Sequence, residues 1–369
     1  MTASNMSGAA NSSPSTEGAS SLTAIIGAGL AGLACARVLA DAGEQVTLFD
    51  KGRGPGGRMS SKHRPEAVLD LGAQAFSVRD DAFDEEVARW QAAGCVGQWP
   101  ERIYRASPTG WQPHHDGQVR YAGLPRMSAI TRHLAATLEA NDVTLHTATP
   151  ITALIRKNAE WWLESNNTEL HGPYTQVVIT APPPQAAILV QPWDTQLFEL
   201  CQRLVQRGCW AGWAVFAEPL PTPIGIEKDW QMARVDHPAL RLVCRNQTKP
   251  GREDQPESLS LLANLEWSET HLEATPDAIT QSLLDALKSL YPAPLKLPEL
   301  LDSGAHRWRY SQPDQDNPFP ELGFAHSASG LALCGDSLRG GRVEDAWLSG
   351  HRLGLSLLES ENIKCGSAG

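Results

Sequence analysis

Three glycines at a fixed spacing are the first residues whose types and positions suggest chemistry. Gly27, Gly29 and Gly32 form a Gly-x-Gly-x-x-Gly motif, and Asp50 follows about 20 residues later. The first glycine permits a tight turn, the second lets the backbone approach a pyrophosphate, and the third allows close packing of a helix on a strand. A helix N-terminus offers free N–H groups and a partial positive charge to phosphates. The motif therefore predicts a nucleotide diphosphate site, with Asp50 accepting hydrogen bonds from ribose hydroxyls.

The elements around this motif are those that such a site needs. Residues 23–27 predict a short buried strand, apolar residues at helical spacing follow until about Gly43, and residues 45–50 predict a second strand. Together they make a βαβ unit, which is the context that gives the glycine motif its meaning. The nucleotide contacts expected from this unit are Gly27, Ala28, Gly29, Leu30, Ala31, Gly32, Asp50 and Lys51.

A second glycine-rich segment, residues 51–59, continues directly from the second strand. It contains Gly56-Gly57-Arg58-Met59, and a strand pattern follows over residues 68–74. A glycine-rich surface turn would require neither the arginine nor that strand. The segment resembles the second glycine motif of the amine-oxidase-like FAD superfamily, and the resemblance implies FAD, bound non-covalently, where the first motif alone leaves FAD and NAD open. The contacts that it implies are Gly57, Arg58, Met59, Ala73 and Gln74.

The C-terminal part supplies a third piece. Residues 331–334 predict a buried strand, Gly335-Asp336 follows, and a helix pattern starts at Val343. By the same resemblance, Asp336 binds the ribityl or phosphate region, and the positive end of the helix points at the flavin C2 carbonyl. Residues 143–155 and 161–164 predict strands of a β-meander, and residues 176–180 predict a buried strand that three prolines stop. The cofactor contacts expected in these segments are Ile151, Ala181, Asp336, Arg342 and Val343.

These pieces predict an α/β fold. We expect a doubly wound Rossmann-type FAD-binding domain, as in amine oxidases and p-hydroxybenzoate hydroxylase, with a second α+β substrate domain. The predicted boundaries are a disordered tail over residues 1–21, an FAD-binding domain over 22–75, 118–184 and 300–364, and a substrate domain over 76–117 and 185–299.

Composition limits the partners and the location. The chain has 369 residues, a net charge of −11 and seven cysteines, with no Cys-x-x-Cys pair. The acidic balance argues against nucleic-acid and anionic-membrane partners. The odd number of cysteines favours reduced thiols in the cytoplasm over a disulfide framework. We therefore expect a cytoplasmic protein that acts on small molecules, with the oligomeric state left open.

Five motifs together resemble the renalase family over residues 22–358. They are Asp50-Lys51, Gly56 to Met59, Asp70 to Gln74, Pro183-Pro-Gln185 and His306-Arg-Trp-Arg309. The resemblance implies an oxidase that takes hydride from the 2-dihydro, and also the 6-dihydro, isomers of β-NAD(P)H onto flavin N5. The products are β-NAD(P)⁺ and, with O₂, hydrogen peroxide. Residues 258–264 contain no histidine, whereas animal members carry one on a similar strand, so the preferred isomer stays open.

The chemistry of a dihydropyridine fits this class of reaction. Loss of hydride restores aromaticity, so the protein need only hold the donor carbon about 3–3.5 Å from flavin N5 and exclude water. The sequence shows no metal-ligand spacing and no nucleophile motif. Strand alternation places Trp210 and Trp213 on opposite faces of one strand. Three arginines could either bind substrate phosphates or form ion pairs: Arg207, Arg245 and Arg309. The predicted substrate contacts are Arg64, Tyr104, Trp210, Asn246 and Trp308.

Three alternatives share part of the pattern. A flavin amine oxidase has the same cofactor motifs, but arginines suit a cationic amine poorly. No cysteine stands just before the predicted strand of residues 331–334, which leads into Gly335-Asp336, for covalent flavin attachment. An aromatic hydroxylase would carry an Asp-Gly motif where Thr180-Ala181 stands. A non-catalytic FAD- or NAD-binding sensor is compatible with every motif.

Overall fold

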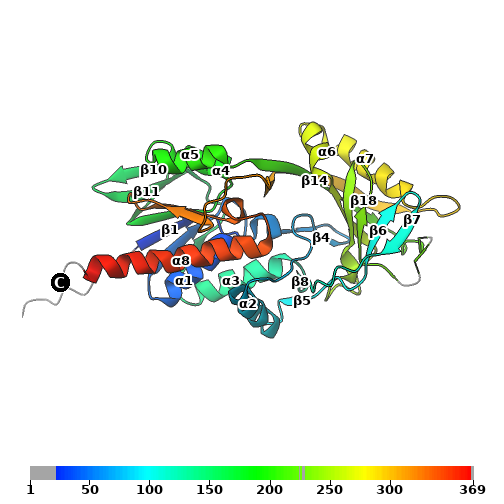
Figure 1. Ribbon diagram of the computed structural model, residues 1–369, viewed down its shortest axis with the longest axis horizontal. Coiled ribbons are helices and arrows are strands. Elements are labelled where there is room, and N and C mark those ends of the chain that lie inside the picture. Colours follow the sequence, from blue (N-terminus) through cyan, green and yellow to red (C-terminus); the bar gives the residue numbers. More distant parts are fainter. Residues whose placement is uncertain (1–21, 224, 227–228, 367–369) are drawn as a thin grey trace, which may run out of the picture.

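The computed structural model describes residues 22–223, 225–226 and 229–366. Two halves follow one another along the long axis of the molecule, one built on a six-stranded sheet and one on a seven-stranded sheet (Figure 1). The predicted disordered tail, residues 1–21, lies outside the described residues. No helix within the described ranges has the length and apolar character needed to cross a membrane.

The six-stranded sheet has parallel neighbours except at one edge, where β19 runs antiparallel to β20. Along β1, Ala24 and Ile26 pack into one core cluster and Ile25 packs into the cluster on the opposite face. This burial on both faces is typical of parallel sheets covered by two layers. The strand order is β19 (Phe324–His326), β20 (Leu331–Cys334), β13 (Gln176–Ile179), β1 (Leu22–Ile26), β2 (Gln45–Phe49) and β9 (Thr144–His146).

Different elements cover the two faces of this sheet. Helices α1 (Leu30–Asp41), α3 (Ser128–Glu139) and α8 (Val343–Gly366) lie on one face, with α1 packed between the other two. The other face carries the antiparallel meander β10 (Ile151–Lys157), β11 (Glu160–Ser165) and β12 (Leu170–Tyr174), together with α4 (Pro183–Val190) and α5 (Thr195–Arg203). The predicted α/β fold is confirmed, although β9 joins the main sheet instead of the meander.

The second half is a mostly antiparallel sheet with two helices on its outer face. Helices α6 (Leu265–Thr270) and α7 (Pro276–Ser289) cover that face. The opposite face, here called the inner face, is turned toward the six-stranded half. The strand order is β18 (Leu300–Pro313), β14 (Gln206–Phe216), β17 (Ser258–Ala263), β16 (Leu240–Arg245), β15 (Met232–Val235), β6 (Ile103–Ser107) and β7 (Gly110–Pro113).

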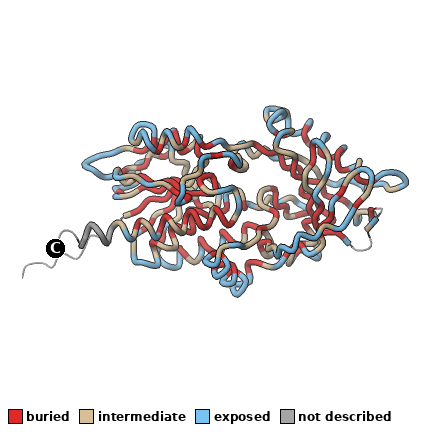
Figure 2. The backbone as a smooth tube through the Cα atoms, in the orientation of Figure 1, coloured by how far each residue is buried: buried red, intermediate tan, exposed pale blue. Residues whose placement is uncertain are grey.

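Short elements connect the halves. They are α2 (Asp81–Ala92) and the pairs β3 (Ser61–His63) with β4 (Val68–Asp70) and β5 (Val96–Gln98) with β8 (Tyr121–Gly123). Buried segments run through the interior of both halves (Figure 2). Leu69 and Leu71, from β4 and just after it, pack against the inner face of the second sheet. The end of the predicted cofactor strand is therefore held between the two halves.

Three predicted domain boundaries are wrong. Residues 300–313, expected in the cofactor domain, form β18, because their backbone pairs with β14 over almost the whole strand. Residues 185–203, expected in the substrate domain, belong to α4 and α5 and pack under the six-stranded sheet. Helix α2 also packs on the cofactor half, since the ring centroid of Phe83 lies 5.5 Å from that of Trp347 in α8.

Candidate cofactor and active site

The turn between β1 and α1 has the geometry of a phosphate cradle. Gly27 has a φ of +113°, and a Cβ there would lie 2.2 Å from Thr180 Oγ1; a Cβ at Gly32 would lie 2.0 Å from Gly27 O. The space in front of Gly29 is open, and a Cβ on Gly57 would approach only the Gly29 Cα, at 3.6 Å. The two glycine segments thus lie close together, and the space in front of Gly29, where a phosphate group is expected, is open.

The first turn of α1 has backbone donors to offer. Gly29 is the N-cap residue and has no side-chain capping hydrogen bond. The N–H of Leu33 is bonded to Gly29 O, which leaves the preceding amides, those of Leu30, Ala31 and Gly32, without an intrahelical partner. These donors and the helix dipole favour a bound phosphate at this position.

Asp50 stands at the end of β2 beside this turn. Its carboxylate accepts hydrogen bonds from Ala28 N at 2.7 Å and Gly52 N at 2.6 Å. These bonds fix the carboxylate against the turn, and its remaining acceptor positions suit ribose hydroxyls. Lys51 points elsewhere, with its Nζ 3.3 Å from Gln185 Oε1 of α4.

Arg58 and Asp336 meet although they lie far apart in the sequence. The guanidinium donates to both carboxylate oxygens, with Nη1 2.7 Å from Oδ2, and also to Ser311 O at 2.9 Å. Asp336 is buried, and Met59 beside Arg58 is buried as well. The backbone of Gly72 packs so closely on Arg58 O that a Cβ would lie 1.9 Å away. The second glycine segment, the predicted flavin strand and the C-terminal segment therefore come together.

Helix α8 begins next to this junction. Asp345 caps it by accepting from Arg342 N at 3.1 Å, and Glu344 accepts from the backbone N–H groups of Arg79 and Asp80 at 2.6 and 2.9 Å. Val343 is half-buried at the first position. The positive end of α8 is thus held in place by side chains of its own first turn and by the segment before α2.

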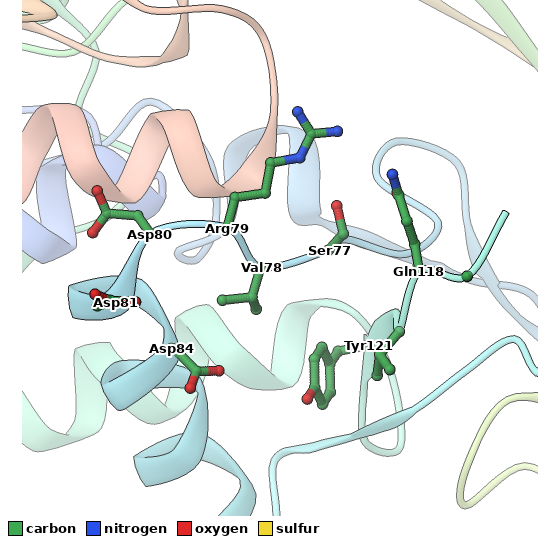
Figure 3. Close-up of a pocket in the computed structure, with 10 residues that line it drawn as sticks. Ser77, Val78, Arg79, Asp80, Asp81, Asp84, Gln118 and Tyr121 are labelled. Atoms are coloured by element: carbon green, nitrogen blue, oxygen red, sulfur yellow. The ribbon is translucent and has the colours of Figure 1, made fainter.

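A hollow of about 440 Å³ borders this helix start. It lies between residues 77–84 and 117–121, and the Arg79 side chain turns away from Asp81 and Asp84 (Figure 3). The bonds from Arg79 N and Asp80 N to Glu344 place its wall directly beside the first turn of α8.

Ile151 and Ala181 lie at the edges of the predicted cofactor region. Ile151 starts β10 and is half-buried against the meander core. Ala181 follows β13, next to Thr180, whose N–H donates to Ile26 O at 2.9 Å. Ala181 therefore lies close to the turn at Gly27, whereas Ile151 belongs to the layer below the sheet.

Gln74 is part of a buried charged network that the sequence did not predict. Its Nε2 donates to Asp70 O at 2.5 Å and to Gly72 O at 3.1 Å, and its Oε1 accepts from Lys249 Nζ at 3.1 Å. Lys249 Nζ also lies 2.9 Å from Asp70 Oδ2, and Arg252 Nη2 lies 2.6 Å from the same oxygen. Ala73, between Gly72 and Gln74, is half-buried and donates its N–H to Arg58 O at 3.1 Å.

This network ties β4 to the second half. Asp70, Lys249 and Arg252 are buried. Burial alone would raise the pKa of Asp70, but the charges of Lys249 and Arg252 outweigh it and hold the pKa below its ordinary value of 3.8. Burial lowers the pKa of Lys249, against the opposing attraction of Asp70. Two cations thus share one carboxylate behind the strand that carries Ala73 and Gln74.

The predicted substrate residues fall on both faces of the second sheet. Trp308 lies on the inner face and donates its indole N–H to Leu71 O at 2.9 Å. Asn246 is buried in the Asp70 network, where its Nδ2 donates to Ser260 Oγ at 3.0 Å. Arg64 forms a forked ion pair with Asp302, at 2.7 and 2.8 Å.

Two predicted substrate residues are misplaced. Trp210 and Tyr104 are buried in the cluster beneath α7 on the outer face, and the Trp210 indole donates to His271 O at 3.0 Å. Alternation along β14 separates Trp210 from Trp213 as predicted, but Trp213 is the one that faces inward, against Leu69 and Leu71. The alternation of side chains along a strand predicts that these two residues lie on opposite faces, but it does not predict which of them faces the site.

The three arginines left open are all ion-paired. Arg207 binds Glu269, Arg245 binds Glu257, and Arg309 binds Glu273. Their guanidinium groups are therefore committed to the second half itself. These contacts favour the ion-pair interpretation over phosphate binding.

Known proteins support the class that this geometry suggests. The model of a NAD(P)-binding Rossmann-like domain matches residues 25–87, and the model of flavin containing amine oxidoreductases matches residues 112–353. A putative protoporphyrinogen oxidase of Exiguobacterium sp. 255-15 has a similar structure, with a TM-score of 0.70, 12% identity and coverage of 92% of this chain and 99% of that chain. Putrescine oxidase, as its A394C mutant, also gives a TM-score of 0.70, with 13% identity, 92% of this chain and 99% of that chain.

Curated relatives match over short segments only. Hydroxyneurosporene desaturase of Rubrivivax gelatinosus is 44% identical over 122 residues, which are 31% of this chain and 22% of that protein. The chain spans about a quarter or less of the length of such relatives.

Fold and site together define an oxidoreductase that uses FAD as its cofactor. The chain belongs to the family of flavin containing amine oxidoreductases.

Proposed function

We propose that the protein is an oxidase of dihydro isomers of β-NAD(P)H, with the 2-dihydro isomer as the main substrate and the 6-dihydro isomer as a second one. The substrate loses a hydride and becomes β-NAD(P)⁺. O₂ takes up the two electrons and the proton of that hydride, together with one proton from the solvent, to give hydrogen peroxide. Bound FAD supplies the hydride acceptor. The role of the protein is to bind and orient the dinucleotide and to exclude water.

The charge of the inner face carries this proposal. Lys62 Nζ lies 4.0 Å from the ring centroid of Trp213, and the carboxylate nearby, Asp302, is bound by Arg64 and by the Trp213 indole N–H at 2.9 Å. The carboxylate is thus neutralised, while Lys62 has no ion pair among the described residues. Lys62 and Arg64 both lie over the Trp213 ring, so this aromatic face is already occupied by cations. The positive charge favours an anionic ligand such as a dinucleotide and repels an ammonium group.

A flavin amine oxidase is the second candidate. The family assignment favours it, and a putrescine oxidase is among the proteins of similar fold. At 11–13% identity this likeness concerns the fold, so the amine substrate stays an alternative. A non-catalytic FAD- or NAD-binding sensor is the third.

Hydrogen peroxide formation separates these candidates. The holoenzyme is supplied in turn with purified 2-dihydro-NAD, 6-dihydro-NAD, ordinary NADH, putrescine and benzylamine. We expect peroxide in proportion to the 2-dihydro or 6-dihydro isomer consumed and little from NADH or the amines. Turnover of an amine alone would establish the amine oxidase, and no turnover of any compound would favour the sensor.

A further inference from the structure

The inner face of the seven-stranded sheet is packed at one level and open at the next. Trp213 and Leu262 are buried against the β4 region. One step along the strands, His306 pairs with Ala211 in the ladder and shares a ring contact of 4.6 Å with Trp308. His306 is nevertheless exposed and Trp308 half-buried. The sheet therefore has accessible surface on the side that faces the cofactor half.

Arg241 stands on the same face. Between Leu240 and Leu242 the pairing of β16 with β17 shifts in register. Leu240 packs in the outer cluster and Leu242 packs toward the inner ones, so the irregularity lets Arg241 and Leu242 both turn inward. The guanidinium confirms this direction, since Arg241 Nη2 lies 3.9 Å from Cys209 Sγ.

This arginine has no oxygen acceptor. Its Nε is buried without a hydrogen-bond partner, and within the described residues it has no ion pair. The neighbouring arginines Arg207, Arg245 and Arg307 all have carboxylate partners within 3.3 Å. Arg241 is half-buried, and the carboxylate of Glu266 that its charge influences is hydrogen-bonded to Arg207 instead. A buried guanidinium N–H without an acceptor destabilises a fold, because its desolvation is not offset.

We propose that Arg241 binds an anionic group of the substrate, a phosphate oxygen of the dinucleotide pyrophosphate. The inference rests on the proposed function and adds the residue that recognises the phosphates. A guanidinium on an open, partly dehydrated face presents two parallel N–H donors to such an oxygen pair. His306 and Trp308 would then border the rest of the ligand on the same face.

Ligand binding to the oxidised holoenzyme tests the proposal without turnover. The probes are ADP-ribose, which carries the pyrophosphate, and nicotinamide riboside, which carries no phosphate; the readout is calorimetry or the change in flavin absorbance. Loss of two charge-assisted hydrogen bonds weakens binding by about 10- to 100-fold. We expect R241Q to weaken ADP-ribose by this factor and to leave nicotinamide riboside unchanged, with R241K in between.

The matched control is R307Q, which alters an arginine of the same sheet whose partners, Glu273 and Leu272 O, lie on the outer side. R307Q should bind ADP-ribose as the wild type does. An R241Q protein that binds ADP-ribose with wild-type affinity would overturn the proposal, and so would a wild type that binds no ADP-ribose.

Stability gives a second, independent readout. If Arg241 serves a ligand, R241M relieves an unpaired cation, so the Tm of the ligand-free protein should stay equal or rise while ADP-ribose no longer raises it. A lower Tm with unchanged ligand response would assign Arg241 a structural role. Peroxide formation from the dihydro isomers tests the proposed function separately. If the wild type oxidises these isomers but R241Q binds ADP-ribose normally, only the Arg241 site is refuted.

Discussion

Arg58 and Asp336 form a bidentate ion pair, although they lie 278 positions apart in the sequence. The pair joins the second glycine segment to the C-terminal strand–helix unit. Both residues are predicted to contact FAD, and in the structure they bind each other.

We predict that D336N lowers FAD retention and stability together. Arg58 is 31% exposed and Asp336 7% exposed, so solvent reduces the loss to about 1–2 kcal/mol. The ratio of flavin to protein absorbance after gel filtration and the Tm measure the two effects. Removing the surface pair Arg37–Asp41 by R37A should change both by little, about 0.5 kcal/mol or less. Equal effects of D336N and R37A would refute the closing role.

Gly29 and Gly32 should respond differently to a side chain. The space before Gly29 is open, so G29V should leave the Tm of FAD-free protein unchanged but weaken FAD binding at least tenfold, about 1.4 kcal/mol. At Gly32 a Cβ meets Gly27 O at 2.0 Å, so G32V should lower that Tm as well. Flavin fluorescence titration and thermal unfolding test this pair. Normal FAD affinity in G29V would contradict the cradle.

Among the residues of the buried network, substitution of Asp70 should lower the free energy of unfolding most. D70N leaves Lys249 and Arg252 buried without a counter-charge, which destabilises by about 3–5 kcal/mol. K249M leaves the Asp70–Arg252 pair and should destabilise less. Denaturant unfolding of both variants gives the order, and a smaller loss for D70N would contradict this account.

The Asp70 carboxyl group also predicts that the free energy of unfolding falls at acid pH. Because the folded pKa of Asp70 lies below the ordinary value of 3.8, its contribution is complete above about pH 3.8 and is lost as the pH falls through the folded pKa. The free energy of unfolding of the wild type should therefore decline more steeply below pH 3.8 than that of D70N. Parallel curves for the two proteins would remove Asp70 from the explanation.

The six thiols for which the structure describes the surroundings should be inert in the folded protein. Cys35, Cys95, Cys201, Cys209, Cys244 and Cys334 are all buried. Burial raises the pKa of Cys35 to about 12 and that of Cys95 to about 11, so little thiolate forms at neutral pH. A disulfide reagent should label these six cysteines only after unfolding, and labelling of the folded protein would contradict this prediction.

The FAD is expected to be bound non-covalently. Acid precipitation should therefore release all the flavin into the supernatant. Flavin retained in the precipitate would indicate covalent attachment.

Local sequence patterns predicted the elements that depend on local spacing. The turn at Gly27, the acid at Asp50 and the helix start at Val343 follow from short motifs, and the structure has β1, α1, β2, β20 and α8 there. Burial of Ala24 and Ile25 on opposite faces is the reason that the first strand reads as continuously apolar.

Features that depend on distant contacts were missed. Lys249 and Asp70 are 179 positions apart, and neither residue type at its position signals a buried pair. Alternation separated Trp210 from Trp213 without showing which face the helices cover. The assignment of β18 failed because pairing with β14, and not the strand's own sequence, places it in the second sheet.

Anaerobic rapid mixing tests the central claim most directly. Oxidised holoenzyme is mixed with borohydride-reduced NAD⁺, which contains the 2-, 4- and 6-dihydro isomers, and the flavin absorbance near 450 nm is followed. The account predicts fast bleaching whose extent matches the 2-dihydro or 6-dihydro content, and little bleaching by pure NADH. A flavin that stays oxidised with all three isomers would contradict it.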